Sequence, residues 1–542
     1  MKSIAIHFEH DAVVGVPVNE VVPPDRIVPA KILLIDKSDE PSVFAPKARL
    51  CVGGHRDPDG GKYETTAPTA QAVAHRLLLQ LAVLQGWTVW VADVSAAFLQ
   101  GQPLQRETPI YFRVSPAWPP CAHAYIDAHL GKDKRRDLLR AVKGLFGFGE
   151  SPRLWYLEFR RILTEELSFH ELRTAPCVFV WFYECVVAAA VSIHVDDLKA
   201  AGNEHAEPLW VKLKARLQFG EWTSIRQGVT HLGARYRQDD DGIEIDIKDY
   251  TSQIRAMAVP QPLMLEETVT EAQRRALMGL NGQLGWAARE VRADLACGVS
   301  LSQQSTSGAT QADLQAANTL ARRAARPAAL KIGHLGCSPA EVIVVAAGDA
   351  SLGTSPRSGS QAGVAVVLTS PAILDGHAAC SLVEWASTRI KRVVRSSTAA
   401  EVHGSCLALE YATVVRCMWA ELTQADFDLK HWRRHASKHD QLVVLDARTV
   451  FDALEHERTL SDRRASLDLA SLRESLADPA ERCKVKWVPG PQQLADGLTK
   501  RDGNDVLLDV MSGKGWSFKE SEEVAALRAQ QRAYRKELRS RT

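Results

Sequence analysis

The sequence predicts a chain of three or four folded units, in which two regions of mixed helices and strands flank a mostly helical region. Its 542 residues are too many for one ordinary hydrophobic core. Strand-like and helical patterns alternate to about residue 245, give way to helical spacing over residues 266–323, and alternate again over residues 342–499. With 46% hydrophobic and 24% charged residues, the composition is that of a globular protein.

Two helices are predicted in the first region. Residues 69–84 have apolar side chains at helical spacing, and Thr69, which follows a proline, is a suitable N-cap. Residues 154–167 are amphipathic with the same period.

The strands expected in this region end in turns or on acids. Residues 88–94 predict a strand that ends on an aspartate. Residues 185–193 form an apolar run that stops at two aspartates and resumes at Leu198, which predicts a strand, a tight acidic turn and a return strand. Residues 239–247 alternate after a glycine and predict a further hairpin.

Three segments are expected to lie outside the folded cores. Residues 1–40 are rich in Val and Pro without clear periodicity, which is typical of a linker or the remnant of an upstream segment. Residues 333–339, GHLGCSP, are a second linker candidate. Residues 506–542 are expected to form a C-terminal tail, which from Lys519 onward is a charged helix without a core.

Composition also narrows the class of protein. No window holds eighteen uncharged apolar residues, and the N-terminus lacks the apolar stretch of a signal peptide, so neither a membrane span nor secretion is expected. The ten cysteines form no C-x-x-C pair, which favours reduced thiols in a cytosolic or nuclear protein. The net charge is +1, and the basic runs at 132–136, 389–395 and 528–541 are each typical of solvated surface, so charge alone does not establish nucleic-acid binding.

A first set of acids ends two apolar strands. Asp93 closes one, and the adjacent Asp196 and Asp197 form the tip of the predicted hairpin. Single aspartates are common in turns. Two successive carboxylates repel each other, however, and are costly to hold together without a cation. If the strands lie side by side, the three carboxylates are suitable ligands for two Mg²⁺ ions.

A second set of acids lies in the last region. Asp349 and Asp446 close apolar strands, Glu401 lies near the start of a helix with Ser397 or Thr398 as N-cap, and Asp496 precedes a glycine. Taken singly, each is typical of a cap or turn.

Three histidines, His431, His435 and His439, recur every fourth residue. On a helix they would share a face and could bind zinc. Without a nearby cysteine or paired acid, an exposed basic linker is the favoured interpretation.

Residues 47 to about 303 resemble the reverse transcriptase of copia-type retrotransposons, block by block and in the family's order. The blocks are KARLCVGG (47–54), YETTAPTA (63–70), VADVSAAFLQG (91–101), LRAVKGLFGFGESPRLWY (139–156), IHVDD (193–197), FGEW and THLGARY (219–236), and LMGLNGQLGWAAREVRADLACGVSLSQQ (277–304). The resemblance implies a right-hand α+β polymerase with fingers and palm over residues 41–250 and a mostly helical thumb or connection over 251–335.

The resemblance also implies roles for single residues. The metal ligands would be Asp93, Asp196 and Asp197. The other residues that it places in the site are Lys47 and Arg49 on the incoming triphosphate, Phe98 as an aromatic gate against the 2′-hydroxyl, and Gly147 and Pro152 at a turn beside the template. A core aromatic remains the alternative for Phe98, and an exposed basic strand the alternative for the two cations.

Residues 340–505 are similar to the α/β RNase H domain that follows reverse transcriptase in these polyproteins. The similarity rests on GDAS (348–351), SLVEWASTRIKRVVRSSTAAEVHG (381–404), VVLDART and, close to literally, QLADGLTK (493–500). It implies that Asp349, Glu401, Asp446 and Asp496 are catalytic metal ligands. They would hold two Mg²⁺ ions and cleave the RNA of a hybrid, which the 2′-hydroxyl distinguishes from DNA.

Several residues depart from the family pattern. Glu150 stands where glutamine is usual, and His194 where tyrosine is usual. VRADL (291–295) lacks the usual proline, and ASLDL (465–469) lacks the usual histidine. All seven proposed metal ligands are retained, which argues for recent function. Two alternatives stay open: a degenerate or domesticated copy that binds nucleic acid without catalysis, and an enzyme with RNase H activity alone.

The resemblance implies the remaining expectations. The cofactor would be Mg²⁺ or Mn²⁺, two ions per active site. The partners would be an RNA template, a DNA primer, an RNA–DNA hybrid and dNTPs, with other Pol domains (integrase, protease) or a second copy of the chain, and no membrane. The expected location is a cytoplasmic virus-like particle or the nucleus.

Overall fold

The computed structural model describes residues 2–36, 45–259, 264–456, 460, 462–501 and 505–519. The chain divides into two compact units. The first unit comprises residues 1–70, 91–181 and 188–222, and the second comprises residues 71–90, 182–187 and 223–542. Neither unit is a continuous stretch of sequence, because the second takes residues 71–90 from within the first mixed region.

Residues 1–40 were predicted to form a linker or the remnant of an upstream segment, but residues 2–36, which the structure describes, are folded. They form α1 (Lys2–Glu9), β1 (Val13–Pro17), β2 (Ile27–Val28) and β3 (Ala30–Asp36). Ile4, Val13 and Val28 are buried in one apolar cluster of the first unit. The elements have two to eight residues each, which is too short for a helical or strand period to stand out in the sequence.

Two small sheets complete this part of the first unit. One has the order β1-β7-β6-β2, with β7 at Lys134–Ala141 and β6 at Ile110–Arg113. The other is the antiparallel pair of β3 with β4 (Pro46–Val52), in which Ile35 faces Lys47. α3 (Pro120–His129) lies between β6 and β7 in the sequence.

The central sheet carries the predicted acidic hairpin. Five of its strands follow the order β5-β11-β10-β9-β8. Their bounds are β5 (Val89–Asp93), β8 (His170–Glu171), β9 (Val178–Tyr183), β10 (Val186–His194) and β11 (Asp197–Gly202). β10 and β11 are antiparallel and pair His194 with Asp197, so the predicted tight turn consists of Val195 and Asp196, and Asp197 already belongs to β11.

One helix of the first unit matches the amphipathic pattern in the sequence. α4 spans Ser151–Arg161 and continues as a π-helical turn over Ile162–Glu166, so it covers the helix predicted at 154–167 except for Leu167. α5 spans Glu207–Arg216, after which the chain passes through the short strand β12 (Thr223–Ser224).

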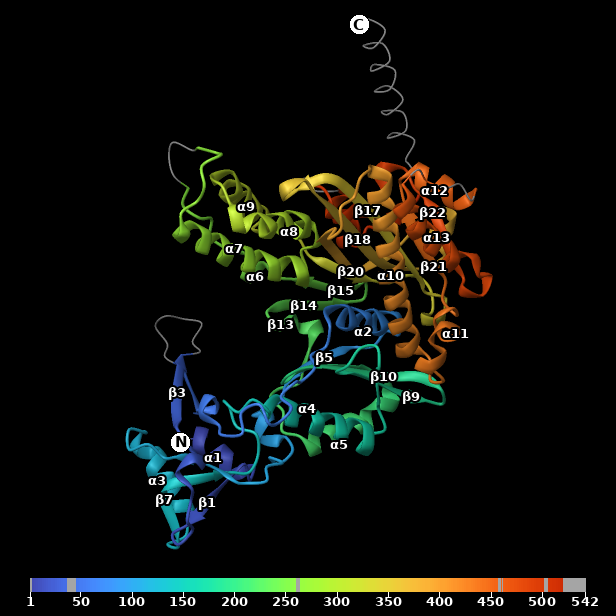
Figure 1. The fold of residues 1–542 in the computed structure, drawn as a ribbon. Helices are drawn as coiled ribbons and strands as arrows, with labels where there is room; N and C mark the ends of the chain where they lie inside the picture. Colours follow the sequence, from blue (N-terminus) through green and yellow to red (C-terminus); the bar gives the residue numbers. More distant parts are fainter. Residues whose placement is uncertain are drawn as a thin grey trace, which may run out of the picture. The chain divides into compact units, whose positions relative to one another are not determined.

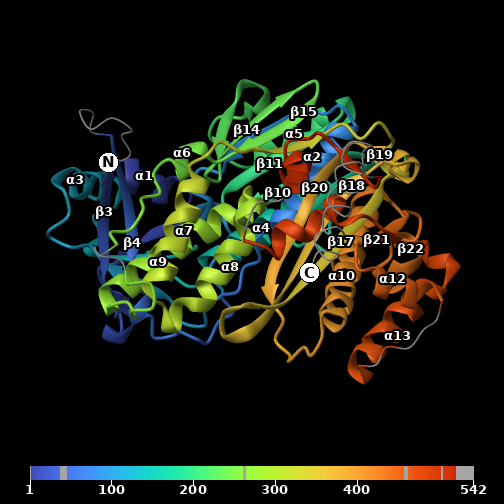
Figure 2. The same ribbon diagram turned by 90° about the horizontal axis from the view of Figure 1, so that it is seen from above.

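In the second unit, the region predicted to be helical forms α7 (Glu271–Glu290), α8 (Ala296–Ser305) and α9 (Gln311–Ala324). The three helices lie together (Figure 2) and share an apolar cluster that includes Leu277, Leu295 and Leu314. The short helix α6 (Lys248–Thr251) precedes them. A four-stranded sheet in the order β13-β14-β15-β16 contains the predicted hairpin near residue 240. Its strands are β13 (Val229–His231), β14 (Ala234–Asp239), β15 (Gly242–Asp246) and β16 (Leu330–Gly333).

Helix α2 (Ala72–Leu84) is built into the second unit by a buried arginine. The helix begins after Gln71 rather than at the predicted N-cap Thr69. Arg76 is 4% exposed, and its guanidinium donates to the carbonyl oxygens of Val383 (2.9 Å) and Arg289 (2.7 Å). The same group lies 3.9 Å from the ring centre of Trp385. Residues distant in sequence therefore share one core.

The last mixed region is a five-stranded sheet in the order β20-β18-β17-β21-β22. Its strands are β17 (Ile343–Ser355), β18 (Gly359–Thr369), β20 (Cys380–Arg389), β21 (Gln441–Leu445) and β22 (Cys483–Trp487). The first three pair antiparallel, and β21 and β22 run parallel to β17. α10 (Ser397–Thr423) packs on β17 and β18 (Figure 1). This order and these directions are those of an RNase H-like fold, as the resemblance implies.

The remaining elements correct two expectations. They are α11 (Trp432–Ala436), α12 (Arg448–Glu455), α13 (Arg463–Ala477), α14 (Asp505–Met511), β19 (His377–Ala378) and β23 (Trp516–Ser517). The start of the predicted tail is folded, because β23 pairs with β19 and Trp516 is buried; residues 520–542 lie outside the described residues. His435 and His439 are buried, so the segment around them is not an exposed linker.

No helix in the described part of the chain is long and apolar enough to cross a membrane.

Candidate active sites

The acidic hairpin places Asp196 in the turn itself and Asp197 at the start of β11. Val195, the other turn residue, has φ = +61°. A β-branched residue is strained in this left-handed region, and such strain is concentrated at functional sites.

Backbone hydrogen bonds bring Asp93 to the same turn. The amide of Val94 donates to the carbonyl oxygen of Asp196 (2.8 Å), and the amide of Gly220 donates to that of Asp93 (2.7 Å). The end of β5 is thus held between the turn and the segment that follows α5. The Asp93 side chain is exposed, and those of Asp196 and Asp197 are half-buried. The backbone segments that carry the three acids therefore meet at a surface that solvent reaches, although oxygens of their three carboxylates do not all lie within 4.8 Å of one another.

The residues predicted to contact the triphosphate lie on β4. Lys47 is exposed and Arg49 is half-buried. The guanidinium of Arg49 lies 5.3 Å from the ring centre of Phe146, and that ring lies 5.1 Å from the ring of Phe98. Phe146 thus links Arg49 to the predicted gate. The sequence interpretation missed it, although an aromatic beside a glycine that the family pattern singles out was a usable signal.

A close backbone approach holds β4 against the segment that carries Phe146. The amide of Val52 donates to the carbonyl oxygen of Phe146 (2.8 Å). Gly147 has φ = +110°, and a Cβ atom there would lie 2.0 Å from the carbonyl oxygen of Val52. Only glycine fits this position. Pro152 lies in the first turn of α4, where its missing amide leaves no helical bond unmade.

Glu150 does not present a free negative charge. It is buried and accepts from Nη2 of Arg106 at 2.6 Å. Arg106 also donates from both Nη atoms to the carboxylate of Asp57 (2.8 and 2.6 Å). Its side chain is 3% exposed, so this ion-pair cluster is shielded from water. The negative charge that Glu150 introduces in place of the usual glutamine is therefore paired with Arg106.

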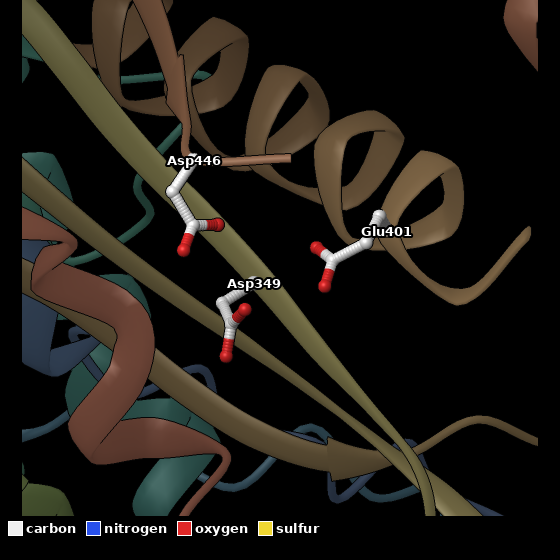
Figure 3. Close-up of side chains that lie close together, drawn as sticks. All are labelled: Asp349, Glu401 and Asp446. Carbon is white, nitrogen blue, oxygen red and sulfur yellow. The ribbon is translucent and has the colours of Figure 1, made fainter. Parts of the chain in front are cut away.

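The second site brings three acids into contact distance. Asp349 is on β17, Glu401 on α10, and Asp446 directly follows β21. Ala347 of β17 pairs in parallel with Val444 of β21. Two residues further along each chain segment, this register places Asp349 beside Asp446. One carboxylate oxygen from each of the three acids lies within 4.8 Å of the others, and the side chains point toward one another (Figure 3). Among the described residues, this is the one group of three acidic, histidine or cysteine ligands at that spacing.

The fourth predicted ligand, Asp496, lies in the 3-10 helix at Leu494–Leu498. It pairs with the ammonium group of Lys500, and the hydroxyl of Thr499 donates to Asp349. Oδ1 of Asp496 is buried and accepts no hydrogen bond from the described residues. Asp496 thus borders the three-acid group without joining it.

Burial and mutual repulsion change the proton affinity of these acids. Burial, with repulsion from Asp496, raises the pKa of Asp349 to about 6. Burial, with repulsion from Asp349 and Asp446, raises the pKa of Glu401 to about 9. Burial likewise raises the pKa of Asp496. The group therefore favours a bound proton or cation over three bare carboxylates.

This donor set fits a divalent metal. Clustered carboxylate oxygens are the ligands that Mg²⁺ and Mn²⁺ prefer. The buried Oδ1 of Asp496 offers one more oxygen without a hydrogen-bond donor among the described residues. Asp349, Glu401 and Asp446 would hold a first ion, and Asp496 would complete the site.

Comparisons with known proteins agree with this arrangement. Residues 14–259 match the family described as reverse transcriptase (RNA-dependent DNA polymerase). The retrovirus-related Pol polyproteins from transposons RE1 and RE2 of Arabidopsis thaliana are 28% and 26% identical over 206 residues, and that from TNT 1-94 of Nicotiana tabacum is 24% identical over 190 residues. The match covers 37% of this chain for the first two and 34% for the third, and 13% of the length of each relative.

A solved structure shares the fold. The foamy viral protease–reverse transcriptase dRH, in complex with double-stranded DNA, aligns with 89% of this chain and 67% of its own, with a TM-score of 0.50 and 13% identity. The right-hand polymerase fold with a following RNase H-like domain is thereby confirmed. Residues 14–259 are thus similar to the reverse transcriptase (RNA-dependent DNA polymerase) family, and part of the chain is similar to the retrovirus-related Pol polyproteins of plant transposons.

Proposed function

We propose that this chain is an RNA-directed DNA polymerase with ribonuclease H activity. The observation that carries the proposal is that three acids from distant segments converge at one place, while backbone hydrogen bonds bring the segments of three further acids together at another. Asp93 lies beside the turn that bears Asp196, and Asp349 lies with Glu401 and Asp446 within 4.8 Å. Two divalent cations bound at each place, Mg²⁺ or Mn²⁺, would supply Lewis-acid stabilisation of the attacking and leaving oxygens.

In the polymerase site, the chain's own residues position the ligands and select the nucleotide. Hydrogen bonds on both sides of the β5 end keep Asp93 beside Asp196 and Asp197. Lys47 and Arg49, on one strand, supply positive charge to an incoming deoxynucleoside triphosphate.

The same strand connects to the proposed sugar gate. The ring of Phe98 would crowd a ribose 2′-hydroxyl, and Phe146 fixes that ring relative to Arg49. Charge recognition and sugar discrimination would therefore depend on one aromatic contact.

In the nuclease site, Asp349, Glu401, Asp446 and Asp496 would orient a water molecule toward the RNA strand of a hybrid. The raised proton affinity of Glu401 and Asp349 disfavours their bare ionised forms. These four acids would hold the cations that offset their mutual repulsion, and the cleavage expected of the site is endonucleolytic hydrolysis.

The proposed partners follow from the relationship to Pol polyproteins. They are an RNA template, a DNA primer and the hybrid that extension creates. Further partners would be other Pol domains, integrase and protease, or a second copy of the chain. The proposed location is a cytoplasmic virus-like particle or the nucleus.

Two activity assays on the full chain test the proposal. One measures extension of an oligo-dT primer on a poly-A template with Mg²⁺, and the other measures cleavage of an RNA–DNA hybrid. The double variant Asp196→Asn/Asp197→Asn should lose extension and keep cleavage, and Asp349→Asn should do the reverse. Each variant thus serves as the folding control for the other.

The alternatives correspond to other outcomes. Cleavage without extension by the parent chain would support an enzyme with RNase H activity alone. Absence of both activities, with intact binding of the hybrid, would support a non-catalytic copy.

A further inference from the structure

The acidic turn receives a side-chain hydrogen bond from outside its own hairpin. Nε1 of Trp155, on α4, donates to the carbonyl oxygen of Val195 at 2.6 Å. Trp155 is 1% exposed, so its ring is fixed in the core of the first unit. Val195 is the residue that holds the left-handed conformation, with φ = +61°.

Both carbonyl groups of the two-residue turn are therefore bound from outside. Val195 accepts from Trp155, and Asp196 accepts from the amide of Val94 in β5. The first bond holds the strained residue, and the second ties the turn to the strand that carries Asp93. Together they determine where the carboxylates of Asp196 and Asp197 lie.

Apolar packing beneath the turn is incomplete. A cavity of about 110 Å³ borders Trp155, Val195, Cys177 and Pro68. A void contributes no contacts that could hold a strained residue in place. The indole N–H is consequently the one polar support that the described side chains give to Val195 from this side.

We propose that Trp155 is a positioning residue for the polymerase site, which holds Val195 in its left-handed conformation and so aligns Asp196 and Asp197 with Asp93. The inference rests on the proposed polymerase function. The simpler interpretation is that the bond only satisfies a buried indole N–H, as buried tryptophans generally require. The two interpretations differ in what loss of the N–H does to the turn.

The first test measures the turn directly and does not depend on activity. Hydrogen–deuterium exchange of the peptide containing residues 193–197 is compared between the parent chain and Trp155→Phe. We expect exchange to become about threefold to tenfold faster, which corresponds to the loss of one neutral hydrogen bond. Trp118→Phe is the matched control, because Trp118 is buried in the same unit and donates to the carbonyl oxygen of Ala30 at 3.4 Å.

The second test measures catalysis. Trp155→Phe should lower kcat for primer extension about threefold to tenfold and raise the Mg²⁺ concentration for half-maximal rate, with KM for the nucleotide within about twofold of the parent. Adding Val195→Gly should restore most of the loss, because glycine adopts positive φ without strain. Trp118→Phe should leave all three parameters unchanged.

One further variant separates the N–H from the volume of the ring. Replacement of Trp155 by benzothienylalanine keeps the bicyclic ring and has sulfur in place of the N–H, so it remains informative if Trp155→Phe folds poorly. Exchange and kinetics equal to those of the parent in this variant would overturn the proposal. Failure of Val195→Gly to restore kcat would also overturn it. If the parent chain extends no primer, the proposed function fails, while the exchange comparison still decides the role of Trp155.

Discussion

Gly348 of strand β17 and Gly404 of helix α10 meet backbone to backbone. A Cβ atom on Gly348 would lie 2.5 Å from the carbonyl oxygen of Gly404, and one on Gly404 would lie 2.9 Å from the carbonyl oxygen of Asp349. Glu401 lies less than one helical turn before Gly404. The contact of the two glycines therefore sets the distance between Glu401 and Asp349.

We expect Gly348→Ala to push α10 away from β17. Overpacking of this kind costs about 1–3 kcal/mol of stability, and hybrid cleavage should fall more than primer extension. Urea unfolding and the two activity assays measure the effects. Gly279→Ala is the control, because Gly279 is exposed in α7 with open space at its Cβ position, and it should stabilise by about 0.5–1 kcal/mol. Equal loss of both activities in Gly348→Ala would contradict a local effect.

The acids of the nuclease site predict a pH dependence of stability. The pKa of Glu401 rises from 4.5 to about 9 on folding, so the folded chain binds a proton that the unfolded chain releases. This contribution is fully present below pH 4.5 and is lost as the pH rises toward 9. In EDTA, the urea midpoint of the parent should therefore fall between pH 5 and pH 9 more than that of Glu401→Gln. Added Mg²⁺ should raise the midpoint most at high pH; a parent and variant with parallel pH profiles would refute this.

Arg106 forms buried ion pairs with Asp57 and Glu150. We therefore expect stability to depend strongly on Arg106 and only weakly on whether residue 150 is glutamate or glutamine. Glu150→Gln keeps a hydrogen-bond acceptor for Arg106, which also retains both bonds to Asp57, so stability should change by less than about 1 kcal/mol. Arg106→Gln leaves two buried carboxylates without their cation, and should cost about 3–5 kcal/mol. Chemical unfolding measures both. A larger loss in Glu150→Gln than in Arg106→Gln would show that the cluster is not organised around the guanidinium.

The ring of Phe146 lies against both Arg49 and Phe98, so we expect nucleotide affinity and discrimination between deoxyribose and ribose to be linked. Phe146→Ala removes the ring between Arg49 and Phe98, so we expect KM for dNTPs to rise about threefold to tenfold. Discrimination against ribonucleotides should fall in the same variant. Phe146→Tyr keeps the ring and is the matched control. Steady-state extension with dTTP and UTP gives both quantities, and an unchanged dTTP/UTP ratio in Phe146→Ala would rule out the coupling.

The local sequence pattern was sufficient to predict the secondary-structure elements that carry the candidate metal-binding acids. The hairpin at Asp196 was predictable because an apolar run, two adjacent acids and a second apolar run leave few other conformations. The strand that ends at Asp93 was predictable from an apolar run that stops at an acid. The helical region over 266–323 was predictable from the helical spacing of its apolar residues. The N-cap of the helix that carries Glu401 is Ser396, one residue before the predicted Ser397 and two before the alternative Thr398.

Features that depend on contacts between distant residues were not predictable. Arg106 and Glu150 are separated by 44 residues, so their ion pair is invisible to periodicity, and the sequence showed Glu150 only as a departure from the family pattern. The buried positions of His435 and His439 depend on tertiary packing in the same way. Residues 2–36 escaped detection because each element is short, and because β1 and β2 are stabilised by pairing with strands more than 70 residues later.

The place of Arg76 has a consequence for how this protein can be divided. Its guanidinium is bound by carbonyl groups of residues 289 and 383, although Arg76 itself lies between two stretches of the first unit in the sequence. A single cut in the chain therefore cannot release the second unit with its core complete. A fragment that begins after residue 90 would lack the guanidinium that donates to the carbonyl oxygens of Arg289 and Val383.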